Sequence, residues 1–246
     1  MMRTGTNARA MQGHAAMMDR VYRRQRHFYD LTRKYYLFGR DTMLEAMAIP
    51  EGGRVLEVGC GTGRNLAAAA RRTPHALFYG FDISSQMLES AAGNIQRSNA
   101  QGRIFLAQGD AENFDACAQF RVGGFDRVFL SYTISMIPGW QQAIRHALTQ
   151  LKPDGSLHLV DFGTMDGWPS FARAAMRHWL ARFHVKPREN LDQYLAQLAH
   201  ETGLILRTAR LGGGYAVIAS LAPDRQPTLQ PAGRDGIDWF AQATHP

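Results

Sequence analysis

The sequence predicts an α/β fold in which seven β-strands, mostly parallel, carry helices on both faces of one sheet. Apolar segments of strand length alternate along the chain with segments of helical length, which is the pattern of successive βαβ units. The last two strand segments are separated only by residues 211–214, which is too short for a crossover helix. We therefore expect the final two strands to form a hairpin, so that the seventh strand is antiparallel.

The chain divides into three expected parts. Residues 1–49 should form a basic helical arm or lid, residues 50–222 the α/β core with a helical cap inserted at 170–202, and residues 223–246 a C-terminal tail. The expected strands are Arg54–Val58, Leu77–Phe81, Ile104–Ala107, Arg127–Ser131, Leu157–Asp161, Ile205–Arg210 and Tyr215–Leu221. The expected helices are Ala15–Tyr29, Thr32–Met47, Arg64–Arg72, Ser85–Arg97, Trp140–Leu151, Ser170–His184 and Leu191–Thr202.

The net charge of +7 is concentrated in the expected arm. Residues 1–40 contain nine Lys and Arg but only Asp19 and Asp30, and the remaining 19 basic and 19 acidic residues balance. A basic arm favours an anionic surface, either nucleic acid or the headgroups of acidic lipids. The alternative is a solvated helix face without a partner.

The composition excludes several classes of protein. No apolar run approaches the roughly 18 residues of a membrane-spanning helix. The polar N-terminus lacks the apolar stretch of a secretory signal, and Cys60 and Cys117 suggest no disulfide framework. We therefore expect a cytoplasmic protein. The nine histidines show no metal-ligand spacing, so no metal is expected.

A glycine-rich loop is the strongest local signal. The strand Val55–Val58 leads directly into Gly59, Gly61 and Gly63, and a helix rich in alanine follows. Such glycines let the backbone turn and approach a ligand at a helix N-terminus. The loop lacks the Gly-Lys-Ser/Thr ending of a Walker loop and the G-x-G-x-x-G spacing of a dinucleotide loop. Glu57, an acidic residue inside the strand, is the distinguishing feature.

Two more acidic residues follow the next two strands. Asp82 ends the second strand, where a carboxylate can accept hydrogen bonds from the ribose hydroxyls of a nucleotide. Asp110 follows the third strand, where a carboxylate can accept from an adenine amino group. A single Asp at a strand end is commonly a helix cap. Acids at three successive strands beside a glycine loop instead favour an adenosine-containing ligand.

These motifs together resemble those of class I S-adenosylmethionine-dependent methyltransferases, which have a Rossmann-like fold, and the resemblance covers roughly residues 50–221. It implies S-adenosylmethionine as cofactor and S-adenosylhomocysteine as product. The segment Glu57–Gly63 would hold the methionine portion, Asp82 the ribose and Ile83 the adenine face. Asp110 and Ala111 would meet the adenine edge, and Ser131 would line the methyl-transfer side.

A narrower resemblance concerns the acceptor. The segment His27–Asp41 is similar to the leader of bacterial betaine-lipid N-methyltransferases, which trimethylate diacylglyceryl-homoserine. Segments Ser131–Pro138, Val160–Gly163 and Ala181–Val185 are also similar to that family, and phosphatidylethanolamine N-methyltransferases are close relatives of it. The resemblance implies a lipid amine substrate, peripheral association with the anionic inner face of the membrane, and a partner enzyme that supplies the homoserine lipid.

The acceptor should approach from the side of the crevice opposite the glycine loop. We expect Tyr29 and Tyr132 to be catalytic, and Arg40, Met136 and Asp161 to contact the substrate. Arg40 would pair with the headgroup carboxylate. The alternative for Arg40 is a pair with the adjacent Asp41 or with a helix end.

The expected helix Ser170–His184 has an aromatic half, which includes Phe171, Trp179 and Phe183, and an arginine-rich half. This pattern indicates an interfacial helix or a helix that caps the active site with its apolar face in the core.

Three other functions compete. A nucleic-acid methyltransferase acting on base amines would carry an Asn/Asp-Pro-Pro-aromatic run where Ser131–Ile134 stands, so nucleic acid is not the expected partner. A quinone-biosynthesis methyltransferase would share the fold and a lipophilic substrate. A cofactor-binding but inactive regulatory subunit is disfavoured by the intact glycines and acids.

Overall fold

A computed structural model describes residues 37–224 and 240–242 of the chain. The helices are α2 (Arg40–Ala46), α3 (Arg64–Arg72), α4 (Ser85–Arg97), α5 (Ala116–Phe120), α6 (Trp140–Thr149), α7 (Ser170–Ala181) and α8 (Leu191–Thr202). The strands are β1 (Arg54–Val58), β2 (Leu77–Asp82), β3 (Ile104–Gln108), β4 (Phe125–Ser131), β5 (Leu151–Phe162), β6 (Ile205–Leu211), β7 (Ala216–Ala222) and β8 (Phe240–Gln242).

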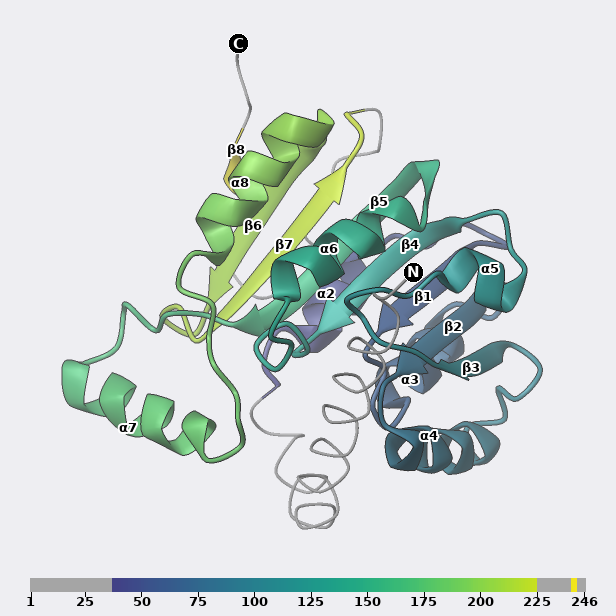
Figure 1. The fold of residues 1–246 in the computed structure, drawn as a ribbon, viewed down its shortest axis with the longest axis horizontal. Coiled ribbons are helices and arrows are strands. Elements are labelled where there is room, and N and C mark those ends of the chain that lie inside the picture. The colour runs from purple at the N-terminus through teal and green to yellow at the C-terminus, as the bar shows by residue number, and fades with distance from the viewer. Residues whose placement is uncertain (1–36, 225–239, 243–246) are drawn as a thin grey trace, which may run out of the picture.

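All strands lie in one sheet with the order β3-β2-β1-β4-β5-β7-β6-β8 (Figure 1). Strands β1 to β5 pair with one another in parallel, with Val55 of β1 opposite Phe78 of β2 on one side and Arg127 of β4 on the other. Strand β7 lies between β5 and β6 and is antiparallel to both. The predicted seven-stranded sheet with an antiparallel last strand is therefore confirmed.

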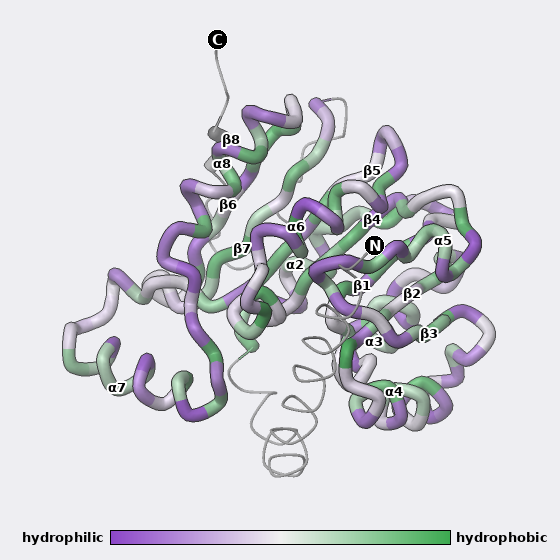
Figure 2. The backbone as a smooth tube through the Cα atoms, viewed as in Figure 1, coloured by the Kyte–Doolittle hydropathy of each residue, from purple (hydrophilic) through white to green (hydrophobic). Residues whose placement is uncertain are grey.

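Each face of the sheet carries its own buried cluster. Helices α5, α6 and α8 contribute to one cluster, and α2, α3, α4 and α7 contribute to the other. Figure 1 shows α6 and α8 in front of the sheet and α2 behind it. Figure 2 shows the reason: central strands such as β4 and β7 are mostly hydrophobic, whereas the covering helices alternate hydrophobic and hydrophilic segments. The prediction of helices on both faces is confirmed.

Helix α2 is fastened to the sheet by a buried arginine of β4. The Arg127 guanidinium donates to the carbonyls of Met47 (2.5 Å) and Ala48 (2.8 Å), which follow the helix. These carbonyls have no partner further along the helix, so the arginine supplies one. The end of α2 is thereby held where β1 and β4 begin, because Arg127 pairs with Val55 near the start of both strands.

Some elements differ from the prediction. The short helix α5 was not predicted, because five residues are too few to show a helical period. Strand β5 begins at Leu151, where the sequence predicted the end of a helix, since a shift in register between Phe125 and Arg127 lets it continue pairing with β4. Within the tail, β8 extends the sheet by pairing with β6.

The expected arm and cap are only partly described. Residues 1–36 lie outside the described residues, and with them Tyr29, the helix expected at 15–29 and most of the arm. Of the expected cap at 170–202, α8 instead packs on the sheet through Leu191, Leu195 and Leu198, while α7 projects from the body (Figure 1). Within residues 37–224 and 240–242, no helix is long and apolar enough to cross a membrane.

Candidate active site

The glycine loop joins β1 to α3 at the carboxyl edge of the sheet. Gly59, Gly61 and Gly63 all have positive φ, at 70°, 52° and 68°, which only glycine adopts readily. A Cβ on Gly59 would lie 2.3 Å from the Cγ2 of Thr133, in the segment after β4. The glycines therefore let two loops of the site pack directly against each other.

Asp82 holds this loop from the end of β2. Its Oδ2 accepts the amide of Gly61 (2.8 Å), and its Oδ1 accepts the amide of Ser84 (3.0 Å) at the start of α4. An ionised carboxylate has about four lone-pair positions, so fastening the loop and accepting ribose hydroxyls are compatible roles. The sequence predicted the second role and missed the first.

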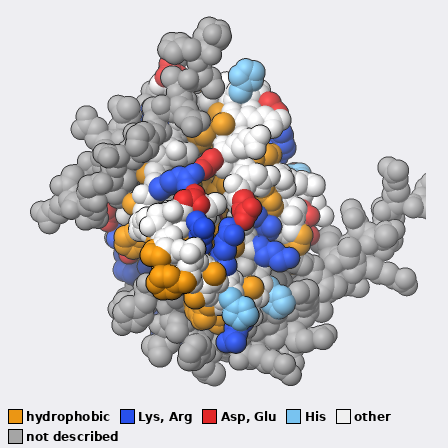
Figure 3. All heavy atoms as spheres, turned by 90° about the vertical axis from the view of Figure 1, so that its left-hand side faces the viewer, with side chains coloured by type: hydrophobic (Ala, Val, Ile, Leu, Met, Phe, Trp, Pro, Cys, Tyr) orange, Lys and Arg blue, Asp and Glu red, His pale blue; other side chains and the backbone are white. Residues whose placement is uncertain are grey.

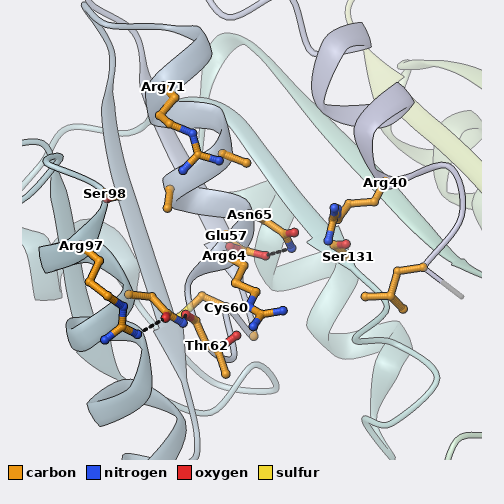
Figure 4. A pocket seen from close by; sticks show the side chains of 15 residues that line it. Arg40, Glu57, Cys60, Thr62, Arg64, Asn65, Arg71, Arg97, Ser98 and Ser131 are labelled. Carbon is orange, nitrogen blue, oxygen red and sulfur yellow. Dashed lines mark hydrogen bonds between the residues drawn. The ribbon is translucent and has the colours of Figure 1, made fainter. Parts of the chain in front are cut away.

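A cavity of about 420 Å³ opens beside the loop. Its lining includes Arg40 at the start of α2, Glu57 of β1, Asn65 of α3 and Ser131 of β4, which Figure 4 shows grouped around the same space. Glu57 is 1% exposed, and its Oε1 accepts a hydrogen bond from the Asn65 amide (2.7 Å). Ser131 is 4% exposed, and no described residue offers a hydrogen-bond partner to its Oγ.

The residues predicted for the adenine end lie on the neighbouring strand ends. Ile83 is half-buried, and its carbonyl accepts a bond from the Gln108 amide (2.9 Å). Asp110 is half-buried and accepts the amide of Glu112 (3.0 Å) in a local turn. Ala111 is buried in the core cluster under α5 and α6. The structure thus brings these residues to the edge where Asp82 lies, and their contact with adenine stays a prediction.

Tyr132 is held by a hydrogen bond to the backbone before α2. Its side chain is buried, and its hydroxyl donates a hydrogen bond to the carbonyl of Phe38, just before α2. Burial also raises the pKa of this phenol well above its usual value, which disfavours the tyrosinate. In the structure Tyr132 fixes the segment that precedes Arg40, and its catalytic role stays a prediction.

Asp161 is likewise held by hydrogen bonds to the backbone, and its contact with the substrate stays a prediction. It is 1% exposed, and it accepts the amides of Ser135 (3.1 Å) and Phe162 (2.7 Å). Arg188 braces the same segment by donating to the carbonyls of Ile134 (3.0 Å) and Ile137 (2.5 Å). These bonds hold the loop after β4 in place beside the glycine loop. Burial raises the pKa of the Asp161 carboxyl to about 6.

The other predicted acceptor residues are placed as follows. Met136 is half-buried in the loop after β4 and packs against the cluster that contains α2. Arg40 lines the same cavity as Glu57 and the glycine loop, its guanidinium is 3.4 Å from Asp41, and its contact with the substrate stays a prediction. Within the described part of the chain, no group of three or more His, Cys, Asp or Glu residues could hold a metal ion.

The residues present fit S-adenosylmethionine. Buried polar groups almost always have hydrogen-bond partners, so the unpartnered hydroxyl of Ser131 facing the cavity indicates a polar ligand. Glu57 and four arginines, Arg40, Arg64, Arg71 and Arg97, line the same cavity, and Asp82 lies at the neighbouring strand end.

Comparison with known proteins agrees with this geometry. Residues 55–155 match the family described as a methyltransferase domain. A methyltransferase of Streptomyces halstedii is 27% identical over 169 residues, covering 68% of this chain and 58% of the relative. A demethylmenaquinone methyltransferase of Lactobacillus johnsonii is 26% identical over 179 residues, covering 70% of this chain and 69% of the relative. The chain spans about three-fifths of the length of most such relatives.

Solved structures share the fold. An O-methyltransferase family protein from Burkholderia thailandensis superposes with a TM-score of 0.63 at 19% identity, over 81% of this chain and 59% of that one. Phosphoethanolamine N-methyltransferase 2 of Haemonchus contortus, solved with S-adenosyl-L-methionine, gives a TM-score of 0.56 at 23% identity, over 70% of this chain and 38% of that one. Residues 55–155 therefore match a methyltransferase domain, and the sheet, the site and the relatives support an S-adenosylmethionine-dependent methyltransferase.

The contact between the glycine loop and Thr133 predicts that adding one methyl group at Gly59 lowers the stability of the fold. Gly59→Ala should lower the free energy of unfolding by about 1–2 kcal/mol for the left-handed backbone and by about 1–3 kcal/mol more for the overlap with Thr133. Gly52→Ala is the matched control, because Gly52 also has positive φ (68°) but nothing lies within 4 Å of its added Cβ. Urea denaturation of both variants measures the difference, and equal losses would contradict the close packing of the two loops.

Burial of Asp161 predicts a pH-dependent stability. The folded state holds the proton with a pKa of about 6, against an ordinary value of 3.8, so it binds more protons than the unfolded chain between these values. The stability that Asp161 contributes is therefore fully present below about pH 4 and is lost as the pH rises to 6.

Asp161→Asn removes this titration. The unfolding free energy of the wild type minus that of the variant should fall by up to about 3 kcal/mol between pH 4 and pH 7. Urea denaturation at several pH values measures it, because the other carboxylates cancel in the difference. A difference that is constant or grows with pH would show that this carboxyl titrates normally.

Proposed function

We propose that this protein transfers the methyl group of S-adenosylmethionine to the headgroup amine of a membrane lipid, and that the lipid is diacylglyceryl-homoserine. The feature that carries the proposal is the outward face of α7 beside the carboxyl edge of the sheet. The similarity of the segment His27–Asp41 to betaine-lipid enzymes supports the choice of headgroup. Most of that segment lies outside the described residues.

Helix α7 presents an apolar anchor to the outside. Its inner side chains, Met176, Trp179 and Leu180, pack against the cluster that also contains α2. Phe171, at the beginning of the helix, is instead 78% exposed. The inner half therefore follows the cap alternative of the sequence prediction, whereas Phe171 points away from the core and is available to a lipid surface.

Basic side chains share this outer face. His178 and Arg182 follow Phe171 by 7 and 11 residues, so the three side chains lie on one face of the helix. All three are exposed. Arg177 is paired with Glu189 (2.6 Å), but among the described residues Arg182 forms no ion pair. Figure 3, which views the side of the molecule that carries α7, shows hydrophobic side chains gathered beside a group of basic ones. An aromatic anchor with adjacent positive charge suits an anionic membrane surface.

The chemistry asks little of the protein beyond positioning. When bound, S-adenosylmethionine would supply an electrophilic methyl group to the lipid nitrogen with S-adenosylhomocysteine as leaving group, and the amine would lose its proton to water. The chain holds the two groups in line and excludes water from the crevice, through the packed loops after β1 and β4. Neither Tyr132 nor Asp161 is needed as a base, which agrees with their bonds to the backbone.

A quinone ring is the second candidate acceptor. The relatives of this chain include ubiquinone/menaquinone biosynthesis C-methyltransferases, one of which, from Geobacter sulfurreducens, is 30% identical over 142 residues. Their acceptors would also partition into the membrane, so the exposed face of α7 suits both. The two candidates differ in the acceptor atom, carbon or nitrogen, and therefore in the product.

An acceptor comparison tests the proposal. The protein is incubated with labelled S-adenosylmethionine and, in matched detergent micelles, with diacylglyceryl-homoserine, phosphatidylethanolamine or demethylmenaquinone. We expect label in the homoserine lipid at a rate at least about tenfold above the other two, which corresponds to about 1.4 kcal/mol in transition-state binding. Equal rates with phosphatidylethanolamine, or label in the quinone alone, would refute the assigned acceptor.

The role of α7 has a separate test. Phe171→Ala should weaken sedimentation with vesicles rich in phosphatidylglycerol by roughly fivefold, because partial insertion of the ring is worth about 1 kcal/mol. Phe105→Ala is the matched control, since Phe105 is also exposed (42%) but lies on β3 at the far edge of the sheet. Unchanged sedimentation of Phe171→Ala, or equal loss in both variants, would remove α7 as the membrane-facing element.

A further inference from the structure

One wall of the cavity beside the glycine loop is built from α3 and α4. Its α3 side consists of Arg64, Ala67, Ala68 and Arg71. The last three residues follow Arg64 at helical spacing, so the four side chains lie on one face of the helix. The short alanine side chains leave a low floor between the two arginines.

The other side of this wall comes from the end of α4. Asn94, Arg97 and Ser98 line the same cavity, and Figure 4 shows Arg71 and Arg97 extending into it from neighbouring helices. Arg97 donates to the Oδ1 of Asn94 (2.6 Å). Arg71 forms no hydrogen bond or ion pair with another described residue. Both arginines are exposed and keep donors for a ligand. Together the residues from α3 and α4 form a basic wall.

The charge of the basic wall identifies the class of ligand. Among the described residues that line the cavity, Glu57 is the one acid, and its Oε1 is bonded to the Asn65 amide at the glycine-loop end. The three arginines of the wall therefore have no acidic neighbour in the lining. A guanidinium holds two phosphate oxygens through parallel N–H donors. The basic wall is complementary to a phosphate group.

Neither the helix ends nor the cofactor accounts for the basic wall. Cations are favourable in the last turn of a helix, where Arg71 and Arg97 lie. Arg64 is instead in the first turn of α3, where the helix dipole disfavours a cation. Arg71 lies about 10 Å further along the helix axis than Arg64. Because α3 runs away from the carboxyl edge of the sheet, Arg71 is remote from the edge that holds the glycine loop and Asp82.

The basic wall lies on the same face of the sheet as α7. Leu66 of α3, Ile95 of α4 and Leu180 of α7 belong to one buried cluster, and Figure 1 shows α4 and α7 at the same end of the molecule. The exposed ring of Phe171 on α7 is the proposed membrane contact. A bilayer that meets this end of the molecule brings lipid phosphates towards the arginines.

We propose that the basic wall binds the phosphodiester group of an anionic phospholipid such as phosphatidylglycerol, which is not the methyl acceptor. The choice of a lipid rests on the proposed membrane association, whereas the choice of a phosphate rests on the arginines. The bound phospholipid gives the protein a second membrane contact beside α7 and thereby fixes its orientation on the bilayer.

Vesicles of matched charge test for a phosphate site. One set contains phosphatidylglycerol and the other contains oleate, both in digalactosyldiacylglycerol, which has no phosphate. Adjusting the two sets to equal zeta potential makes the general attraction of basic residues the same in both. The wild type should sediment with the phosphatidylglycerol vesicles about tenfold more tightly, the scale of one charge-assisted hydrogen bond. Arg71→Gln/Arg97→Gln should bring the two affinities within about twofold, because the exposed charges that remain contribute little.

A second double variant is the matched control. Arg121→Gln/Arg207→Gln removes the same charge from two positions that do not line the cavity. It should change the affinity for both vesicle types equally and keep the preference for phosphatidylglycerol. Arg71→Gln/Arg97→Gln should keep the wild-type Tm, because both side chains are exposed. It should also keep the calorimetric Kd of S-adenosylhomocysteine, because the two arginines lie away from the predicted cofactor contacts.

Equal affinity of the wild type for both vesicle types, or a preference that survives in Arg71→Gln/Arg97→Gln, would overturn the proposal. Weaker binding of S-adenosylhomocysteine to this variant would return the basic wall to the cofactor. Calorimetric binding of inorganic phosphate without a vesicle preference would assign the wall to a soluble phosphate compound, and binding of RNA without that preference would assign it to nucleic acid. None of these measurements contains a methyl acceptor, so their outcome is independent of the lipid or quinone that the protein methylates.

Discussion

The carboxylate of Asp82 is the interaction on which the rest of the site depends. It accepts the amide of Gly61 from the glycine loop and the amide of Ser84 from the start of α4, and thereby ties the loop after β1 to the loop after β2. Without these hydrogen bonds, a loop with glycine at three alternate positions would sample many backbone conformations, since glycine loses the most entropy on ordering. The same carboxylate lies where a ribose is expected, so one residue shapes the site and is also its predicted ribose contact.

A second junction joins the loops after β1 and β4. Gly59 packs against Thr133 without room for a methyl group. The loop that contains Thr133 is held by two hydrogen bonds, from the Ser135 amide to Asp161 and from Arg188 to the carbonyl of Ile134. Parallel strands end at one edge of a sheet, so these loops meet there whatever their sequence separation. The buried charge of Asp161 costs stability and fixes a loop that shapes the acceptor side.

The sequence was sufficient to predict strands β1 to β7, the order of the motifs and the class of cofactor. These features depend on apolar periodicity and on a glycine loop with acids at strand ends. Prediction failed where the outcome depends on the direction of a side chain. Tyr132 was predicted to be catalytic and Asp161 to contact the substrate, and the sequence did not indicate that the first bonds to the Phe38 carbonyl or that the second is buried. The roles of Asn65 and Arg188 could not be predicted from the sequence, because their hydrogen-bond partners are set by tertiary packing. The short β8 was missed because its pairing with β6 is entirely non-local.

The most direct test of the central claim is calorimetric binding of S-adenosylhomocysteine to the wild-type protein and to Asp82→Ala. The wild type should bind, and the variant should lose about 1–3 kcal/mol, because ribose hydroxyls lose a charged acceptor and the glycine loop loses its tie. The loss should extend to 5′-methylthioadenosine, which keeps the ribose. Absence of binding to the wild type, or equal affinity of the variant, would contradict an S-adenosylmethionine site organised by Asp82.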